Sequence, residues 1–145
     1  MIPDYNTDGN LPEGIYLIEE EEFINHFSSI SAKRKWLGDR MRELLALVKS
    51  TGQLDRMFVW GSFVSNKESP NDVDILLIMK ETFQLEKISK ENRFIFDHVA
   101  ARIRFHIDIF WSKSTIGEET LQLWLDTYQI TKDFKRRGIV EVKII

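Results

Sequence analysis

The stretch RMFVWGSFVSNKESPNDVDILLIM, residues 56–79, determines the fold class that the sequence predicts. Its two ends, residues 56–60 and 72–79, are apolar runs of the residue types that favour β-strands. The polar segment between them starts with Gly61 and Ser62. The pattern therefore predicts two strands that are joined by a polar loop.

The segments on either side of this stretch carry apolar residues at helical or strand spacing. Ser31 is a suitable N-cap for a helix that continues to about Thr51 and buries one apolar stripe. A shorter helix is expected at residues 19–27. Further along, the pattern predicts helix, strand, helix and strand at residues 90–101, 103–111, 117–132 and 139–145. This order predicts an α/β (α+β) fold, in which helices pack on a sheet of about four strands.

The chain length is typical of one domain. We expect residues 1–145 to form a single domain, because the sequence contains no internal repeat and no linker-like segment. Residues 1–18 are expected to form an N-terminal arm, because their first part, MIPDYNTDGNLPEG, is rich in turn-forming residues.

The composition excludes several classes of protein. The formal net charge of -3 disfavours bulk nucleic-acid binding, which requires a strongly basic surface. Because the chain has no cysteine, it forms no disulfide and no thiolate zinc site, and any metal must have oxygen or histidine ligands. The N-terminus is unlike a signal peptide, and no apolar run is long enough to span a bilayer. We therefore expect a cytoplasmic protein with no membrane partner.

Two aspartates, Asp72 and Asp74, open the second predicted strand. Because successive side chains of a strand alternate between its faces, both carboxylates are expected on one face while Val73 turns to the core. Gly61 lets the backbone approach a phosphate closely, and Ser62 offers N–H and hydroxyl donors. The loop and the two carboxylates are thus expected to bind phosphate and a hard divalent cation.

A third carboxylate follows from the strand predicted at residues 103–111. On that strand Arg104, His106, Asp108 and Phe110 would share one face. Asp108 is the natural third metal ligand, whereas His106 is expected to be a hydrogen-bonded neighbour of it. Three aspartates suit Mg²⁺ or Mn²⁺, because these cations prefer oxygen ligands and retain positions for water and substrate phosphates.

This pattern resembles the signature of the polymerase-β-type nucleotidyltransferase superfamily, and of its minimal members. The signature is an apolar residue, Gly-Ser, a spacer, Asp-apolar-Asp-apolar and a later third carboxylate on a strand. It is matched here by Trp60, Gly61 and Ser62, the spacer 63–71, Asp72, Val73, Asp74 and Ile75, and then Asp108.

The resemblance implies a nucleotidyltransferase-like fold and a specific reaction. A nucleoside monophosphate, expected to be AMP from ATP, would be transferred to a hydroxyl acceptor with release of pyrophosphate, in a reaction that depends on Mg²⁺ or Mn²⁺. It also implies catalytic and metal-binding roles for Asp72, Asp74 and Asp108, and nucleotide-binding roles for Gly61 and Ser62.

The chain is also similar to minimal nucleotidyltransferases that act as antitoxins beside a helical ribonuclease toxin and transfer AMP onto that toxin. This likeness implies a protein partner such as a toxin. Those relatives usually carry an arginine a few residues after the Gly-Ser pair, whereas the only basic residue of this loop is Lys67. Lys67 either replaces that arginine in nucleotide binding or is solvated.

Other interpretations of the same residues stay open. The chain could be an inactive nucleotidyltransferase-like binding module that serves as an antitoxin or scaffold. A small-molecule adenylyltransferase fits less well, since such enzymes generally have an additional helical domain. The basic runs 33–35 and 135–137 are expected to face solvent. Arg102 and Arg104 are expected to face solvent as well, with contact to a triphosphate as the alternative. The four tryptophans are expected to lie mostly in the core.

Overall fold

The computed structural model describes residues 1–71 and 73–144. In this part of the chain, a five-stranded sheet has the strand order β1-β5-β2-β3-β4. Strand β2 is antiparallel to both of its neighbours, while β1 is parallel to β5 and β3 is parallel to β4. The strands are β1 (Ile15–Glu19), β2 (Leu54–Trp60), β3 (Val73–Met79), β4 (Ile107–Lys113) and β5 (Ile139–Lys143). The α+β class with a mixed sheet is therefore confirmed.

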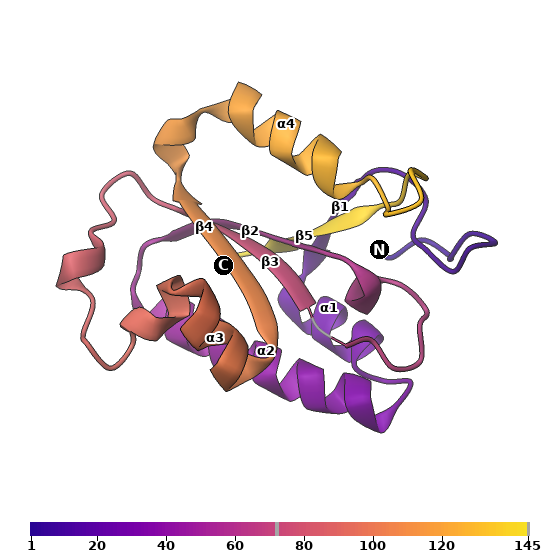
Figure 1. The fold of residues 1–145 in the computed structure, drawn as a ribbon, viewed down its shortest axis with the longest axis horizontal. Coiled ribbons are helices and arrows are strands. Elements are labelled where there is room, and N and C mark those ends of the chain that lie inside the picture. Colours follow the sequence, from indigo (N-terminus) through magenta and orange to yellow (C-terminus); the bar gives the residue numbers. More distant parts are fainter. Residues whose placement is uncertain (72, 145) are drawn as a thin grey trace.

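Four α-helices of the described residues cover the two faces of this sheet unequally. Figure 1 shows α1, α2 and α3 on one face and α4 alone on the other. The apolar side chains accordingly form a large core under the first three helices and a smaller one under α4. The helices are α1 (Glu20–Phe27), α2 (Ala32–Ser50), α3 (His98–Phe105) and α4 (Glu118–Tyr128).

The alternation predicted for the second strand is confirmed from its second residue onward. Val73, Ile75 and Leu77 of β3 belong to the large core. Leu76 belongs to the small core under α4, on the same face as Asp74, because side chains two residues apart point to the same side of a strand. Asp74 therefore lies on the face that α4 covers only in part.

Helix α2 begins where the sequence predicts. The Ser31 hydroxyl accepts a hydrogen bond of 3.2 Å from the backbone N–H of Arg34, which satisfies one of the first-turn donors of the helix. Its buried side includes Leu37, Met41 and Val48, which form the predicted stripe. The helix is the largest single element on the side of the sheet that faces away from Asp74.

The prediction of about four strands was wrong by one, because strand β1 lies within the predicted N-terminal arm. Its backbone pairs with β5, from Ile15 opposite Ile139 to Glu19 opposite Lys143. Only Ile18 of this strand is fully buried. β1 is thus stabilised by pairing with the far end of the chain, which a local pattern does not reveal.

The strand predicted at residues 103–111 begins later, because α3 continues to Phe105. Asp97 caps α3 by accepting from the N–H of Ala100 at 3.1 Å, and His106 ends the helix in the left-handed conformation, with φ 59°. The prediction that Arg104 and His106 share a strand face with Asp108 was therefore wrong. His106 instead packs edge-on against the Trp36 ring.

The helix predicted at residues 90–101 is also replaced in part. A short 3₁₀ turn at Arg93–Phe96 precedes α3.

Among the helices of the described residues, none combines the length and apolar character that crossing a bilayer requires.

Candidate functional site

Two of the three predicted carboxylates are neighbours across the sheet. Asp74 of β3 and Asp108 of β4 are directly paired residues of adjacent parallel strands. Paired residues of neighbouring strands point to the same face and lie about 4.8 Å apart. Asp72, the third predicted carboxylate, lies outside the described residues.

Asp108 is a buried carboxylate with two partners from α3. Its Oδ1 atom lies 2.5 Å from Nη1 of Arg102 and 3.4 Å from Nε2 of His98. The His98 ring also contacts the carbonyl of Ile109 through Nδ1, at 3.3 Å. His98 and Arg102 are four residues apart, so they lie on one side of α3 and reach the same carboxylate.

These contacts revise the interpretation of two basic residues. Arg102 was expected only to face solvent; it remains more than half exposed, yet it binds Asp108. His98 carried no signal in the sequence, because its relation to Asp108 depends on how α3 packs against the edge of β4.

Gly61 lies directly against the Asp74 carboxylate. Its backbone has φ +90°, a conformation that side chains rarely allow. A Cβ atom at this position would lie 2.4 Å from Oδ2 of Asp74, well inside van der Waals contact. A side chain at position 61 would therefore strain the backbone and displace the Asp74 carboxylate.

A cavity of about 560 Å³ opens beside this contact. It brings together Gly61, Ser62, Lys67 and Asp74, four of the residues that the sequence assigns to the site. Asp108 lies on the next strand and does not line the cavity. The remaining lining residues are Asn10, Asn71, Thr131, Lys132, Asp133 and Arg137.

Arg34 of α2 supports the loop that follows Gly61. This residue is fully buried, so the expectation that the basic run 33–35 faces solvent was wrong for it. Its guanidinium donates to the carbonyl of Ser65 at 2.6 Å and to that of Phe63 at 2.7 Å. Burial lowers the pKa of Arg34 below its ordinary value. The other carbonyls that accept from it belong to Phe27, Ser62 and Lys67.

The expectation that most tryptophans pack in the interior is confirmed for Trp60, Trp111 and Trp124, which contact the two cores. Trp60 stacks on Tyr128 of α4, with ring centroids 3.8 Å apart and planes 5° apart. This stack fixes α4 beside the residue that precedes Gly61.

The C-terminal wall of the cavity is a part of the site that the sequence does not reveal. The basic run 135–137 was expected to be solvated, and this is wrong for Arg137, which is partly buried in the cavity wall. Lys132 and Asp133 line the same wall. This segment follows α4 in the chain and forms one wall of the cavity.

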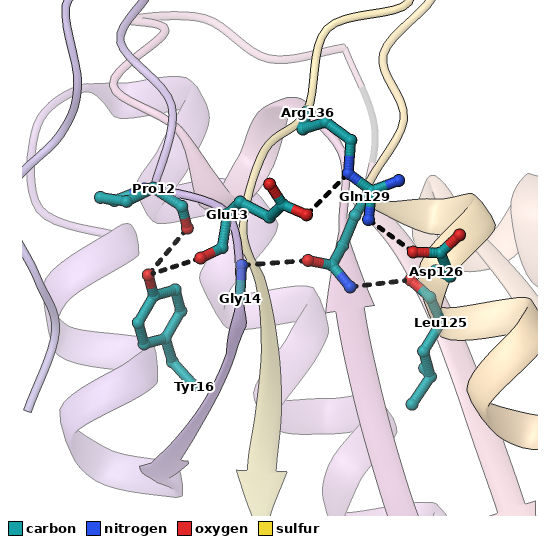
Figure 2. Close-up of polar contacts among 8 residues, drawn as sticks. All are labelled: Pro12, Glu13, Gly14, Tyr16, Leu125, Asp126, Gln129 and Arg136. Atoms are coloured by element: carbon teal, nitrogen blue, oxygen red, sulfur yellow. Dashed lines mark hydrogen bonds and ion pairs between the residues drawn. The ribbon is translucent and has the colours of Figure 1, made fainter.

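Contacts with the N-terminal arm hold this wall in place, as Figure 2 shows. The buried side chain of Gln129 accepts from the N–H of Gly14 at 3.0 Å and donates to the carbonyl of Leu125 at 3.3 Å. Arg136 pairs with Glu13 at 2.8 Å and with Asp126 at 2.5 Å. We call this set of contacts the clasp.

The donor set at the site fits a hard divalent cation, because Asp74 and Asp108 offer carboxylate oxygens on one face of the sheet. Within residues 1–71 and 73–144, no three histidine, aspartate or glutamate side chains gather closely enough to hold a metal ion. The predicted three-acid site includes Asp72, which is outside these ranges, so the metal site stays a prediction.

Comparison with known proteins adds one finding. No curated protein and no solved structure matches the chain. A family model described as a family of unknown function (DUF6932) matches residues 3–143. The chain therefore belongs to this family.

Proposed function

We propose that this protein is a Mg²⁺- or Mn²⁺-dependent nucleotidyltransferase that transfers a nucleoside monophosphate, AMP from ATP, to a hydroxyl acceptor and releases pyrophosphate. One observation carries the proposal: Asp74 faces a cavity shared with Gly61 and Ser62, and Asp108 is its direct neighbour on the next strand. A phosphate-binding loop beside paired carboxylates is the arrangement that this reaction requires.

The cavity is the donor side of the proposed site. Gly61 permits close approach of the backbone, and Ser62 and Lys67 supply hydrogen-bond donors to the phosphates. Asp72, Asp74 and Asp108 would hold the divalent cation, which when bound neutralises phosphate charge and stabilises the leaving pyrophosphate. Much of the rate enhancement would come from positioning of the nucleotide and the acceptor, and from fixed charges that stabilise the transition state.

Asp108 lies on the acceptor side of the proposed site. Arg102 and His98 hold its carboxylate from one direction, through contacts to Oδ1. These contacts hold the carboxylate on the sheet face that it shares with Asp74. The acceptor hydroxyl would then approach between Asp108 and the cavity.

The ion pair of Asp108 with Arg102 also favours a second candidate, an inactive nucleotidyltransferase-like binding module that neutralises or scaffolds a partner protein such as a toxin. In that case Arg102 substitutes for the cation at Asp108. A protein that binds its partner equally well after Asp74→Asn and Asp108→Asn replacement, and transfers no label itself, would match this second function.

The test compares Asp74→Asn with wild type in an assay that uses ATP labelled at the α-phosphate, Mg²⁺ and a protein extract as the source of acceptors. We expect wild type to transfer label and Asp74→Asn to remain folded but inactive. Asp55→Asn is the matched control, because Asp55 is an exposed aspartate of β2 and does not line the cavity. Undiminished transfer by Asp74→Asn would refute the assignment.

A further inference from the structure

Arg137 is a cation of the cavity wall whose hydrogen-bonding capacity is not satisfied. Its Nε atom is buried and has no hydrogen-bond partner among the described residues. An unsatisfied buried donor costs stability, so it usually has a ligand or another role. The neighbouring Arg136 differs, because it pairs with both Glu13 and Asp126.

The charges around Arg137 indicate what it faces. Burial lowers the pKa of its guanidinium, while the negative charges of Asp74 and Asp133 raise it. Arg137 and Asp74 line the same cavity, and the charge of the Asp74 carboxylate therefore acts on the guanidinium. A cation in this position could contact phosphates that are bound beside Asp74.

Two lysines line the same cavity, one of them from a distant part of the chain. Lys67 comes from the loop after Gly61, and Lys132 from the segment after α4. Together with Arg137, they place three cations around a space of about 560 Å³. Such a space is large enough for a nucleotide-sized ligand.

The backbone around Arg137 is fixed. Its own N–H donates to the carbonyl of Gln129 at 2.8 Å, and the N–H of Gly138 donates to the carbonyl of Leu11 at 2.8 Å. The clasp of Gln129 and Arg136 anchors the same segment to the N-terminal arm (Figure 2). Because the segment is anchored on both sides, little ordering of the backbone is needed when a ligand binds.

We infer that Arg137, with Lys67 and Lys132, binds the polyphosphate of a nucleoside triphosphate. A guanidinium presents a planar fork of donors that matches two phosphate oxygens, which suits the β- and γ-phosphates that leave as pyrophosphate. The inference rests on the proposed function for the identity of the nucleotide. Binding of the polyphosphate itself can be measured without turnover.

The experiment measures binding of inorganic tripolyphosphate, ATP and AMP to the full chain by calorimetry in the presence of Mg²⁺. Arg137→Gln is expected to weaken tripolyphosphate and ATP binding by about tenfold or more, since it removes a charged hydrogen bond. AMP binding should change little, because AMP lacks the outer phosphates. The tripolyphosphate affinity of Arg137→Lys should lie between those of wild type and Arg137→Gln, because lysine keeps the charge and loses the planar fork of donors.

Lys135→Gln is the matched control. It removes the same charge two residues away. Lys135 pairs with Asp8 at 3.4 Å and with Asp133 at 3.9 Å, and it does not itself line the cavity. Equal weakening by Lys135→Gln would mean that only net charge matters, and would overturn the inference. So would unchanged tripolyphosphate affinity in Arg137→Gln, or equal loss of AMP and ATP binding.

The outcome also separates this inference from the proposed function. Transfer that needs Asp74, with tripolyphosphate binding that does not need Arg137, would leave the enzyme proposal in place and refute this one. Arg137-dependent binding of tripolyphosphate by a protein that transfers no label would support this inference and refute the enzyme proposal.

Discussion

The Asp74 carboxylate lies where a side chain at Gly61 would have to be: a methyl group on Gly61 would lie 2.4 Å from the Oδ2 atom of that carboxylate. The two residues come from the end of β2 and the start of β3, and Trp60 is paired with Asp74 in the sheet. The glycine therefore sets the position of the carboxylate as well as the conformation of the loop. A site built this way is expected to be sensitive to a single added carbon atom.

Replacement of Gly61 by alanine is the first test of this contact. We expect Gly61→Ala to reduce transfer by about 100-fold, because displacement of a catalytic carboxylate by even 1 Å has effects of that order. Gly52→Ala is the control, because Gly52 also has positive φ, at +66°, but a Cβ there meets nothing within 4 Å. Gly52→Ala should lose about 1 kcal/mol of unfolding free energy from backbone strain. Gly61→Ala should lose more, about 1–3 kcal/mol, because its φ of 90° and ψ of -165° lie in a region that only glycine adopts readily. Equal transfer rates in the two variants would show that the contact with Asp74 has no role.

Arg34 is expected to be essential for the stability of the loop after Gly61. Arg34→Met removes the donors of five backbone carbonyls and should lower the unfolding free energy by about 3 kcal/mol or more. Arg34→Lys should recover little of this loss, because an ammonium cannot reproduce the planar fork. Denaturant unfolding followed by circular dichroism measures both variants.

Arg42→Met provides the comparison on the same helix. Arg42 pairs with Glu21 at 2.7 Å in an exposed position, and such pairs contribute less than about 1 kcal/mol. If Arg34→Met were no less stable than Arg42→Met, the support of the loop by Arg34 would be disproved.

The sequence predicts the residues of the donor side better than the other parts of the site, because these residues are close together in the chain. Gly61, Ser62 and Asp74 lie within one hairpin-like unit, so the period of two along β3 is enough to assign the face of Asp74. Asp108 was predicted as a third metal ligand on a strand, and it does pair with Asp74 in the sheet, although β4 begins four residues later than predicted. The alternation of apolar residues at 103–106 fits the last turn of α3 as well as a strand, and the capping by Asp97 decides for the helix.

The features that the sequence does not predict depend on contacts between distant segments. Strand β1 exists because it pairs with β5, and these strands are separated by most of the chain. Arg137 lines the cavity beside Asp74 only because the segment after α4 returns to this side of the sheet. A run of basic residues is most often solvated, and nothing in its local pattern distinguishes Arg137 from Arg136.

Arg102 is predicted to affect catalysis more than stability. Its side chain is more than half exposed, so Arg102→Ala should cost less than about 1 kcal/mol of unfolding free energy. Because Arg102 positions the Asp108 carboxylate, we expect the transfer rate to fall by about tenfold. Arg104→Ala, on the same helix and paired with Glu43, should leave transfer unchanged. A faster rate in Arg102→Ala would instead mean that the ion pair blocks Asp108, as in an inactive module.

The clasp gives the last prediction, because Gln129 joins the N-terminal arm to the wall that carries Arg137. Gln129→Ala leaves the partly buried N–H of Gly14 without its acceptor and should cost about 1 kcal/mol, because water can replace only part of the lost hydrogen bond. Hydrogen exchange at the Gly14 amide should accelerate, and tripolyphosphate should bind more weakly because the segment around Arg137 loses its anchor. Gln122→Ala is the control, since Gln122 is an exposed residue of α4 whose side chain hydrogen-bonds to Glu118 one turn earlier. Weaker binding in Gln129→Ala with unchanged exchange at Gly14 would contradict this mechanism, because the loss of affinity would then not arise from loosening of the arm.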